Sequence, residues 1–269
     1  MTASATGPDP AAGMHVVAIQ HRLPRAAGRS RLDDDWVRAR AEAVGVTFYE
    51  LRARLRVLDG WPGVLGTYAG ARPAGSVAAA LRREGIAAWV LGAALTEPRT
   101  VVRRFWLRGG RLVVEADGGG SFELHASDVR MLVHGVQMSE DRTFVLSRPV
   151  HAPALRVASG GVVPQSRTRS TRESFVELYA PGCPILSFRA ASLRYAALSD
   201  GVVEPTRVAN FQRVVHTLRT GCPAATYDAR LRGRIEQMRV LGPSLRPELH
   251  LSLAVALVAG RRPDPSPYR

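Results

Sequence analysis

The sequence predicts an α+β protein, in which a small β-α-α-β-α-β sandwich is followed by an antiparallel β-barrel that a C-terminal helix caps. Three observations lead to this fold class. A capping box at Thr47 begins one of several short helices in the first third of the chain. Gly109-Gly110 then separates two apolar runs of strand length. After Pro205 the apolar spacing changes from two, as in strands, to about three and a half, as in helices.

Residues 14–95 are expected to form the first module, with helices on one face of a small sheet and the other face open. Thr47 and Glu50 have the capping-box spacing of a helix N-terminus. The carboxylates of Asp33–Asp35 suit the start of an earlier helix, and three consecutive side chains fan out too widely to favour a metal site. The expected strands are His15–Ile19, Val64–Tyr68 and Ala88–Leu91, and a third helix is expected over Ala74–Glu84.

Residues 101–222 are expected to form the barrel. Alternating apolar residues and the turn signals between them define its strands. The expected strands are Arg104–Leu107, Leu112–Ala116, Ser121–Leu124, Ser174–Tyr179 and Ile185–Ala197.

A helix over Thr206–Leu218 is expected to close this barrel. Its apolar residues repeat at i, i+3, i+7 and i+10, which describes one stripe of an amphipathic helix. Gly221 and Pro223 end it. The stripe must lie on an apolar surface, and the preceding strands are the nearest one. Its members are Val208, Phe211, Val215 and Leu218.

Residues 145–173 are expected to protrude from the barrel as a long hairpin or loop. Arg167, Arg169 and Arg172 alternate there with serine and threonine. Such a segment can follow phosphates or anionic lipid head groups. It can equally be a solvated edge whose charges prevent aggregation. Both interpretations stay open.

The two ends of the chain differ from its centre. Residues 1–13 are rich in small residues and proline and are expected to be a disordered tail without the features of a signal peptide. Residues 223–269 are expected to form a helical extension with a helix over Pro247–Val258 and a proline-rich end. Arg230, Arg232 and Arg234 open this extension, and we include them among the candidate anion-binding residues.

The charge balance is strongly basic. Basic residues number 37 against 23 acidic ones, which gives a formal charge of +14. A charge of this size favours nucleic acid or another anionic surface as a partner. All of the basic residues are arginine, however, and this pattern is typical of codon usage in a GC-rich genome and not of selection for phosphate binding alone.

Candidate catalytic and cofactor groups do not form a convincing motif. Ser121, His125 and Asp128 are the nearest approach to a nucleophile, base and orienting carboxylate, and they are better explained as turn and capping groups. The triple glycine after Asp117 lacks the lysine of a phosphate-binding loop. No cofactor and no metal site is therefore expected. Two cysteines, Cys183 and Cys222, could form a disulfide or serve as buried small hydrophobic residues.

Several segments resemble known families. Val44–Leu91 is similar in element order to the C-terminal module of the ribosomal stalk protein and to the adaptor of the Clp protease. The barrel segment looks like a pleckstrin-homology-like domain. The whole chain resembles a family of uncharacterised bacterial two-module proteins, on the pattern of Asn210-Phe211, Pro223…Tyr227-Asp228…Leu231 and the ending Pro267-Tyr268-Arg269. The resemblance of Val44–Leu91 implies a docking surface and not an enzyme, whereas the whole-chain resemblance implies no activity.

The expected function is accordingly that of a non-enzymatic, cytoplasmic docking or adaptor protein that binds a protein partner or an anionic surface such as lipid. A nucleic-acid-binding protein with an arginine-rich surface is the alternative. The longest apolar run, Leu249–Gly260, is shorter than the roughly 20 residues that a membrane-spanning helix needs.

Overall fold

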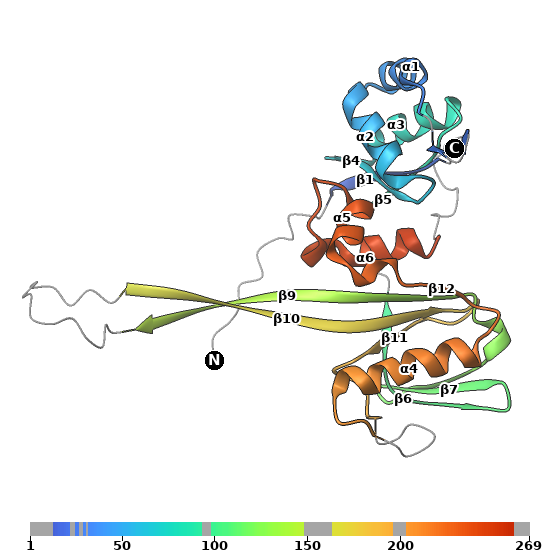
Figure 1. Ribbon diagram of the computed structural model, residues 1–269, viewed down its shortest axis with the longest axis vertical. Helices are drawn as coiled ribbons and strands as arrows, with labels where there is room; N and C mark the ends of the chain where they lie inside the picture. Colours follow the sequence, from blue (N-terminus) through green and yellow to red (C-terminus); the bar gives the residue numbers. More distant parts are fainter. Residues whose placement is uncertain are drawn as a thin grey trace, which may run out of the picture.

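A computed structural model describes residues 13–21, 25–26, 29–30, 32–92, 98–147, 163–195 and 203–260, with backbone alone at 25–26, 29–30, 140–147 and 163–170. These residues form a mixed α+β structure with six α-helices, one sheet of three strands, one sheet of seven strands and a short pair of strands, Arg25–Ala26 with Arg29–Ser30. Helices and the two main sheets alternate in five layers (Figure 1). None of the helices described here is long and apolar enough to cross a membrane.

The upper module is built on the three-stranded sheet. Strand β1 (His15–Gln20) lies between β4 (Gly63–Tyr68) and β5 (Ala87–Gly92), and it is antiparallel to both. Helices α1 (Asp34–Val44), α2 (Phe48–Leu58) and α3 (Ala71–Arg83) cover one face of the sheet. The predicted order of elements and the predicted starts of α1 and α2 are confirmed, whereas α3 begins at Ala71, three residues before the predicted Ala74.

Two side-chain caps explain where the first helices begin. The Asp33 carboxylate accepts hydrogen bonds from two backbone N–H groups of the first turn of α1, so these acids do cap a helix. The capping box at α2 is complete, because Glu50 N–H donates to the Thr47 hydroxyl and Thr47 N–H donates to the Glu50 carboxylate.

The seven-stranded sheet is open and mixed, which corrects the expectation of a closed antiparallel barrel. Its strands follow the order β12-β9-β10-β11-β6-β7-β8. The pairs β11–β6 and β12–β9 are parallel, and strands β12 and β8 form opposite edges. Without a pairing between these edge strands in the part of the chain described, the sheet cannot close. The strands are β6 Arg99–Arg108, β7 Arg111–Ala116, β8 Ser121–His125, β9 Met131–Ser147, β10 Val163–Tyr179, β11 Ile185–Arg189 and β12 Thr226–Asp228.

Helix α4 (Arg207–Gly221) packs on the face of this sheet that is turned away from α5 and α6 (Figure 1). Three of the four residues of the predicted stripe, Phe211, Val215 and Leu218, are buried there against the strands. Val208 is instead 68% exposed, and Val214 supplies the further buried contact. The predicted packing of the helix on the strands is therefore confirmed, although its buried stripe includes Val214 in place of Val208.

Helices α5 (Arg234–Leu241) and α6 (Pro247–Val258) form the middle layer, between the two sheets. Their core includes Val16 and Trp89 from the small sheet together with Phe175 and Tyr179 from the large one. The open face that we expected on the small sheet is therefore covered, because the C-terminal helices carry apolar residues toward both sheets.

Arg54 ties the upper module to this middle layer. Its guanidinium donates to the carbonyl oxygen of Val64 at 2.7 Å and to those of Arg239 and Val240 at 2.9 and 3.2 Å, at the C-terminus of α5. Burial lowers the pKa of Arg54 to about 10, so it stays charged at neutral pH. A cation is favourable at a helix C-terminus, where carbonyl groups lack partners within the helix.

Candidate functional site

The most prominent feature of the large sheet is a two-stranded arm. We define the arm as residues 139–147 of β9 and 163–171 of β10, which pair from Ser139↔Thr171 to Ser147↔Val163. At roughly 3.3 Å per residue these nine positions span about 30 Å. Beyond its base the arm pairs with no third strand in the described part of the chain (Figure 1). An isolated pair of strands is only marginally stable in water.

The arginine-rich segment that had no apolar period is thus a strand in this structure. Its backbone follows the register of β9, and Asp141 lies opposite Arg169. Arg167 and Arg169 lie within this strand, and their side chains fall outside the described residues.

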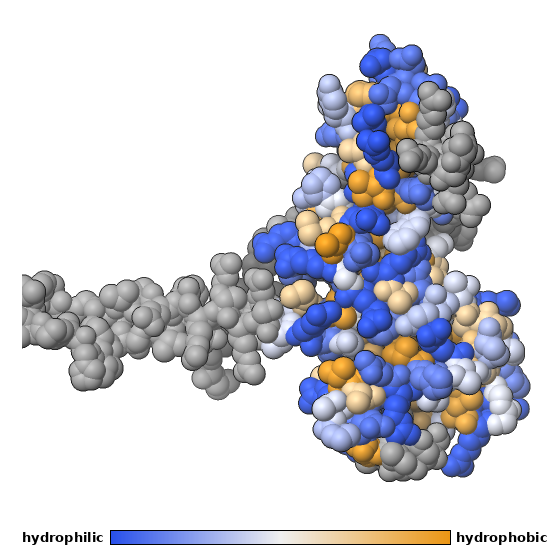
Figure 2. All heavy atoms as spheres, viewed as in Figure 1, coloured by the Kyte–Doolittle hydropathy of each residue, from blue (hydrophilic) through white to orange (hydrophobic). Residues whose placement is uncertain are grey.

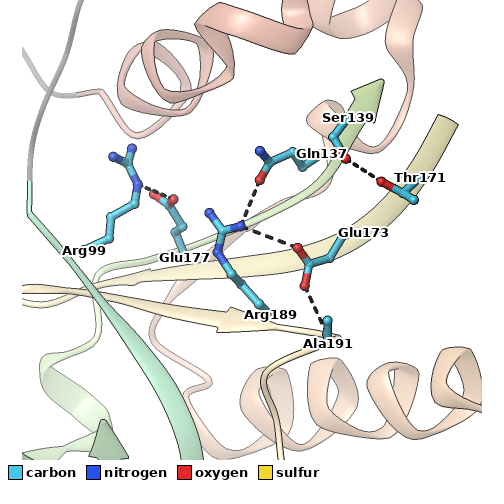
Figure 3. Close-up of polar contacts among 8 residues, drawn as sticks. All are labelled: Arg99, Gln137, Ser139, Thr171, Glu173, Glu177, Arg189 and Ala191. Carbon is cyan, nitrogen blue, oxygen red and sulfur yellow. Dashed lines mark hydrogen bonds and ion pairs between the residues drawn. The ribbon is translucent and has the colours of Figure 1, made fainter. Parts of the chain in front are cut away.

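At the base of the arm, a polar network joins three strands on the face toward α6 (Figure 3). Arg189 of β11 donates to Gln137 of β9 at 2.9 Å and lies 3.5 Å from the Glu173 carboxylate of β10. The second oxygen of Glu173 accepts the Ala191 N–H at 3.0 Å. Ser139 and Thr171 share a hydroxyl hydrogen bond at the first pair of the arm.

A second ion pair extends this network toward β6. Arg99 donates to Glu177 at 2.6 Å, and the Tyr179 hydroxyl donates to the other carboxylate oxygen at 2.8 Å. A cavity of about 90 Å³ lies between these groups and α6. Each guanidinium on this face already contacts a carboxylate, so the network fixes the strands and offers no surplus charge to a ligand.

Surplus positive charge gathers instead around the edge strand β12. We define the arginine cluster as Arg172, Arg219 and Arg232, whose side chains are all exposed. Arg172 donates to the carbonyl oxygen of Arg232 at 3.4 Å, and the Arg219 guanidinium lies over the Tyr227 ring at 4.3 Å. Within the described part of the chain, none of the three has a carboxylate partner.

The positive charges of this cluster affect the pKa values of two neighbouring side chains, His134 and Tyr227. His134 Nδ1 and the Tyr227 hydroxyl share a hydrogen bond of 2.7 Å. Burial, with a smaller contribution from Arg232, lowers the pKa of His134 to about 4. Burial raises the pKa of Tyr227, and the charges of Arg219 and Arg232 oppose that rise. Both side chains are therefore neutral at pH 7, and the positive charge stays with the guanidinium groups.

The structure separates the six candidate anion-binding arginines. Arg172 and Arg232 lie together, as described above. Arg230 is engaged by the Asp228 carboxylate through a 2.6 Å hydrogen bond and stacks on the Trp61 ring at 4.0 Å. Arg234 pairs with Glu248 at 2.8 Å. Local carboxylates thus neutralise two of the predicted residues.

Sequence reasoning missed Arg219, the third member of the cluster. It lies in the last turn of α4, just beyond the apolar stripe. Its position depends on the parallel pairing of β12 with β9, which puts Tyr227 next to it. No local pattern predicts a parallel pairing between strands almost a hundred residues apart.

Other candidate groups stay apart. No group of His, Cys, Asp and Glu residues suited to a metal ion occurs among the described residues. Cys183 and Cys222 are free thiols, and burial raises the pKa of both, that of Cys222 to about 11. A thiol with a raised pKa is a poor nucleophile, which suits the interpretation of these cysteines as packing residues.

Comparisons of the chain with protein-family models, with curated proteins and with solved structures found no match. The resemblances drawn from the sequence therefore stay predictions.

Proposed function

We propose that this protein is a non-enzymatic docking or adaptor protein, which binds an acidic segment of a protein partner at the arginine cluster beside the arm. The observation that carries the proposal is the exposure of Arg172, Arg219 and Arg232 without carboxylate partners among the described residues. Guanidinium groups form bidentate, charge-assisted hydrogen bonds with carboxylates, so an acidic segment is their natural ligand.

The arm is a second feature that supports a docking role. Its backbone N–H and C=O groups on both outer edges have no strand partner in the described structure, and an extended segment can add to such an edge. We place this role in the cytoplasm, in keeping with two free cysteines. The pleckstrin-homology-like resemblance of residues 101–222 agrees with docking but adds no weight of its own.

An acidic protein segment fits better than nucleic acid. Many described arginines, among them Arg38, Arg103 and Arg111, already pair with carboxylates and do not form a continuous basic track. Proteins that bind single strands also use exposed aromatic rings for base stacking. Among the described aromatic residues only Tyr49 is largely exposed, and it lies in the upper module.

The experiment compares two triple variants that lose the same charge. Arg172→Ala/Arg219→Ala/Arg232→Ala removes the cluster, whereas Arg56→Ala/Arg83→Ala/Arg108→Ala removes three exposed arginines elsewhere that also lack carboxylate partners in the described structure. Binding of a fluorescent poly-glutamate peptide is followed by anisotropy at near-physiological salt. Exposed charge pairs contribute about 0.2–1 kcal/mol each, or roughly 2 kcal/mol for three pairs in the middle of that range, so the cluster variant should bind about tenfold or more weakly.

The control variant loses the same net charge from positions outside the cluster. It should therefore retain affinity within about threefold, because long-range attraction alone depends little on the position of a charge. Equal weakening of both variants, or no binding by the natural chain, would overturn the proposal. A DNA or RNA oligonucleotide run in parallel tests the alternative, which the +14 charge favours. Tighter binding of the oligonucleotide, with a steep dependence on salt, would support nucleic-acid binding instead.

A further inference from the structure

Three large apolar side chains are exposed on the otherwise buried middle layer. Ile235 and Met238, three residues apart on α5, are 72% and 48% exposed, and Leu249 in the first turn of α6 is 71% exposed. We call these three residues the apolar ledge. Exposed apolar residues that occur singly are ordinary, but a group of them marks a contact surface.

An ion pair brings the two parts of the ledge together. Arg234 and Glu248 are 2.8 Å apart and join the first turns of α5 and α6, and Ile235 and Leu249 are the residues that follow them. Leu249 also lines the cavity that Gln137 and Arg189 border at the base of the arm. Figure 2 shows apolar atoms bordered by hydrophilic ones at the level of this layer, above the arm.

The charges beside the ledge indicate what covers it. Arg232 lies two residues before the start of α5, and Arg246 is the N-cap residue of α6, so both arginines lie at the N-terminal ends of the helices that carry the ledge. Both arginines are exposed, and within the described structure neither has a carboxylate partner. A second copy of this chain would bring the same positive charges to the same surface and be repelled. A partner that combines apolar and acidic residues is complementary to both features.

We infer that the apolar ledge is the anchoring site for an acidic amphipathic helix of the protein partner. This inference rests on the proposed docking function and specifies the form of the acidic segment. The apolar face of such a helix covers Ile235, Met238 and Leu249, and its carboxylates meet Arg232 and Arg246. Apolar residues at i, i+3, i+4 and i+7 provide the anchors in this mode of recognition.

The test uses two leucine- and glutamate-rich peptides of identical composition. In one, leucines follow the i, i+3, i+4, i+7 pattern; in the other, they are distributed around the helix. The full-length chain should bind the patterned peptide about tenfold more tightly, which is the scale of burying one or two apolar side chains. In the Ile235→Ser/Leu249→Ser variant this preference should fall to about onefold.

The control variant is Val57→Ser/Val208→Ser, which changes two exposed valines on α2 and α4 and should keep the preference. Equal affinity of the natural chain for both peptides would overturn the inference, as would an equal loss in both variants. Failure here is distinguishable from failure of the proposed function. The arginine-cluster variant tests whether the chain binds an acidic peptide at all. The ledge variant tests only whether the chain prefers the patterned peptide to the peptide with distributed leucines.

Discussion

His134 lies in β9, faces α4 and is 7% exposed, so a charged imidazole there would lose most of its hydration. The groups around it are the Tyr227 hydroxyl from β12, the Phe211 ring from α4 at 6.0 Å, and the positive charge of Arg232. Burial disfavours the charged imidazole most, and the nearby Arg232 charge opposes protonation further. This is the physical reason that the pKa of His134 falls from 6.5 to about 4.

This shift predicts a pH-dependent stability. A histidine with a depressed folded-state pKa binds a proton more readily in the unfolded chain than in the folded one. As the pH falls from 6.5 to about 4, proton uptake therefore favours the unfolded chain, and the free energy of unfolding decreases; above pH 6.5 this effect is absent. The loss amounts to roughly 1.4 kcal/mol per pH unit, or about 3 kcal/mol in all. Urea denaturation of the natural chain and of His134→Gln across this window should therefore show a flatter profile for the variant.

Carboxylates that titrate near pH 4 affect both proteins equally and cancel in the comparison. His216→Gln, at an exposed position of α4, is the control and should follow the natural profile. Identical pH profiles for the His134 variant and the natural chain would contradict the argument.

Arg189 shows, at the scale of the element, how the arm is held where it leaves the sheet. Its guanidinium reaches from β11 to side chains of β9 and β10, and all three strands are joined by the contacts of Figure 3. At about 30% exposure for both partners, the pair with Glu173 is better shielded from water than the Arg103–Asp117 pair of the same sheet, which is about half exposed. Shielded, hydrogen-bonded pairs contribute more than exposed ones.

We therefore expect Arg189→Ala to lower the free energy of unfolding by about 1–3 kcal/mol, because Gln137 and Glu173 lose a charged hydrogen-bond partner. Arg103→Ala should change it by less than about 0.5 kcal/mol. Chemical denaturation of both variants measures these values. Amide hydrogen exchange at Gln137 and Glu173 should also accelerate in the first variant alone. Equal effects of the two substitutions would show that the network does not hold the arm.

The sequence predicts correctly those elements that interactions between neighbouring residues determine. The capping box of Thr47 and Glu50, the turn at Gly109-Gly110 and the helix Pro247–Val258 follow from neighbouring residues, and the structure has all three. Helix α5 was missed because its apolar residues do not form one stripe: Val240 and Leu241 are buried, whereas Ile235 and Met238 lie on the exposed side. The arm was predicted as a long hairpin or loop over residues 145–173, and the structure has the hairpin; its strand limits could not be predicted, because pairing with β9, and not composition, makes β10 extended.

At the scale of the whole molecule, α6 is the element that both sheets share. Val255 lines the cavity above the large sheet, whereas Leu257 and Val258 line a cavity beside Trp89 of the small sheet. A helix that is apolar on all sides is a buried helix, and the run from Leu251 to Val258 carries that signal in the sequence. The open sheet and the parallel pairing of β11 with β6 have no such signal, because they depend on contacts between distant segments.

The shared middle layer predicts that the two sheets unfold together. Leu257 is fully buried in the common core, so Leu257→Ala should cost about 2–5 kcal/mol through lost burial and the cavity it leaves. Because α6 packs on both sheets, amide protection in β1 and in β11 should fall by the same factor, as measured by native-state hydrogen exchange. Val208→Ala, at a 68% exposed position, should leave both unchanged. Loss of protection in β1 while β11 keeps its own would mean that the small sheet unfolds independently and that α6 does not couple the two.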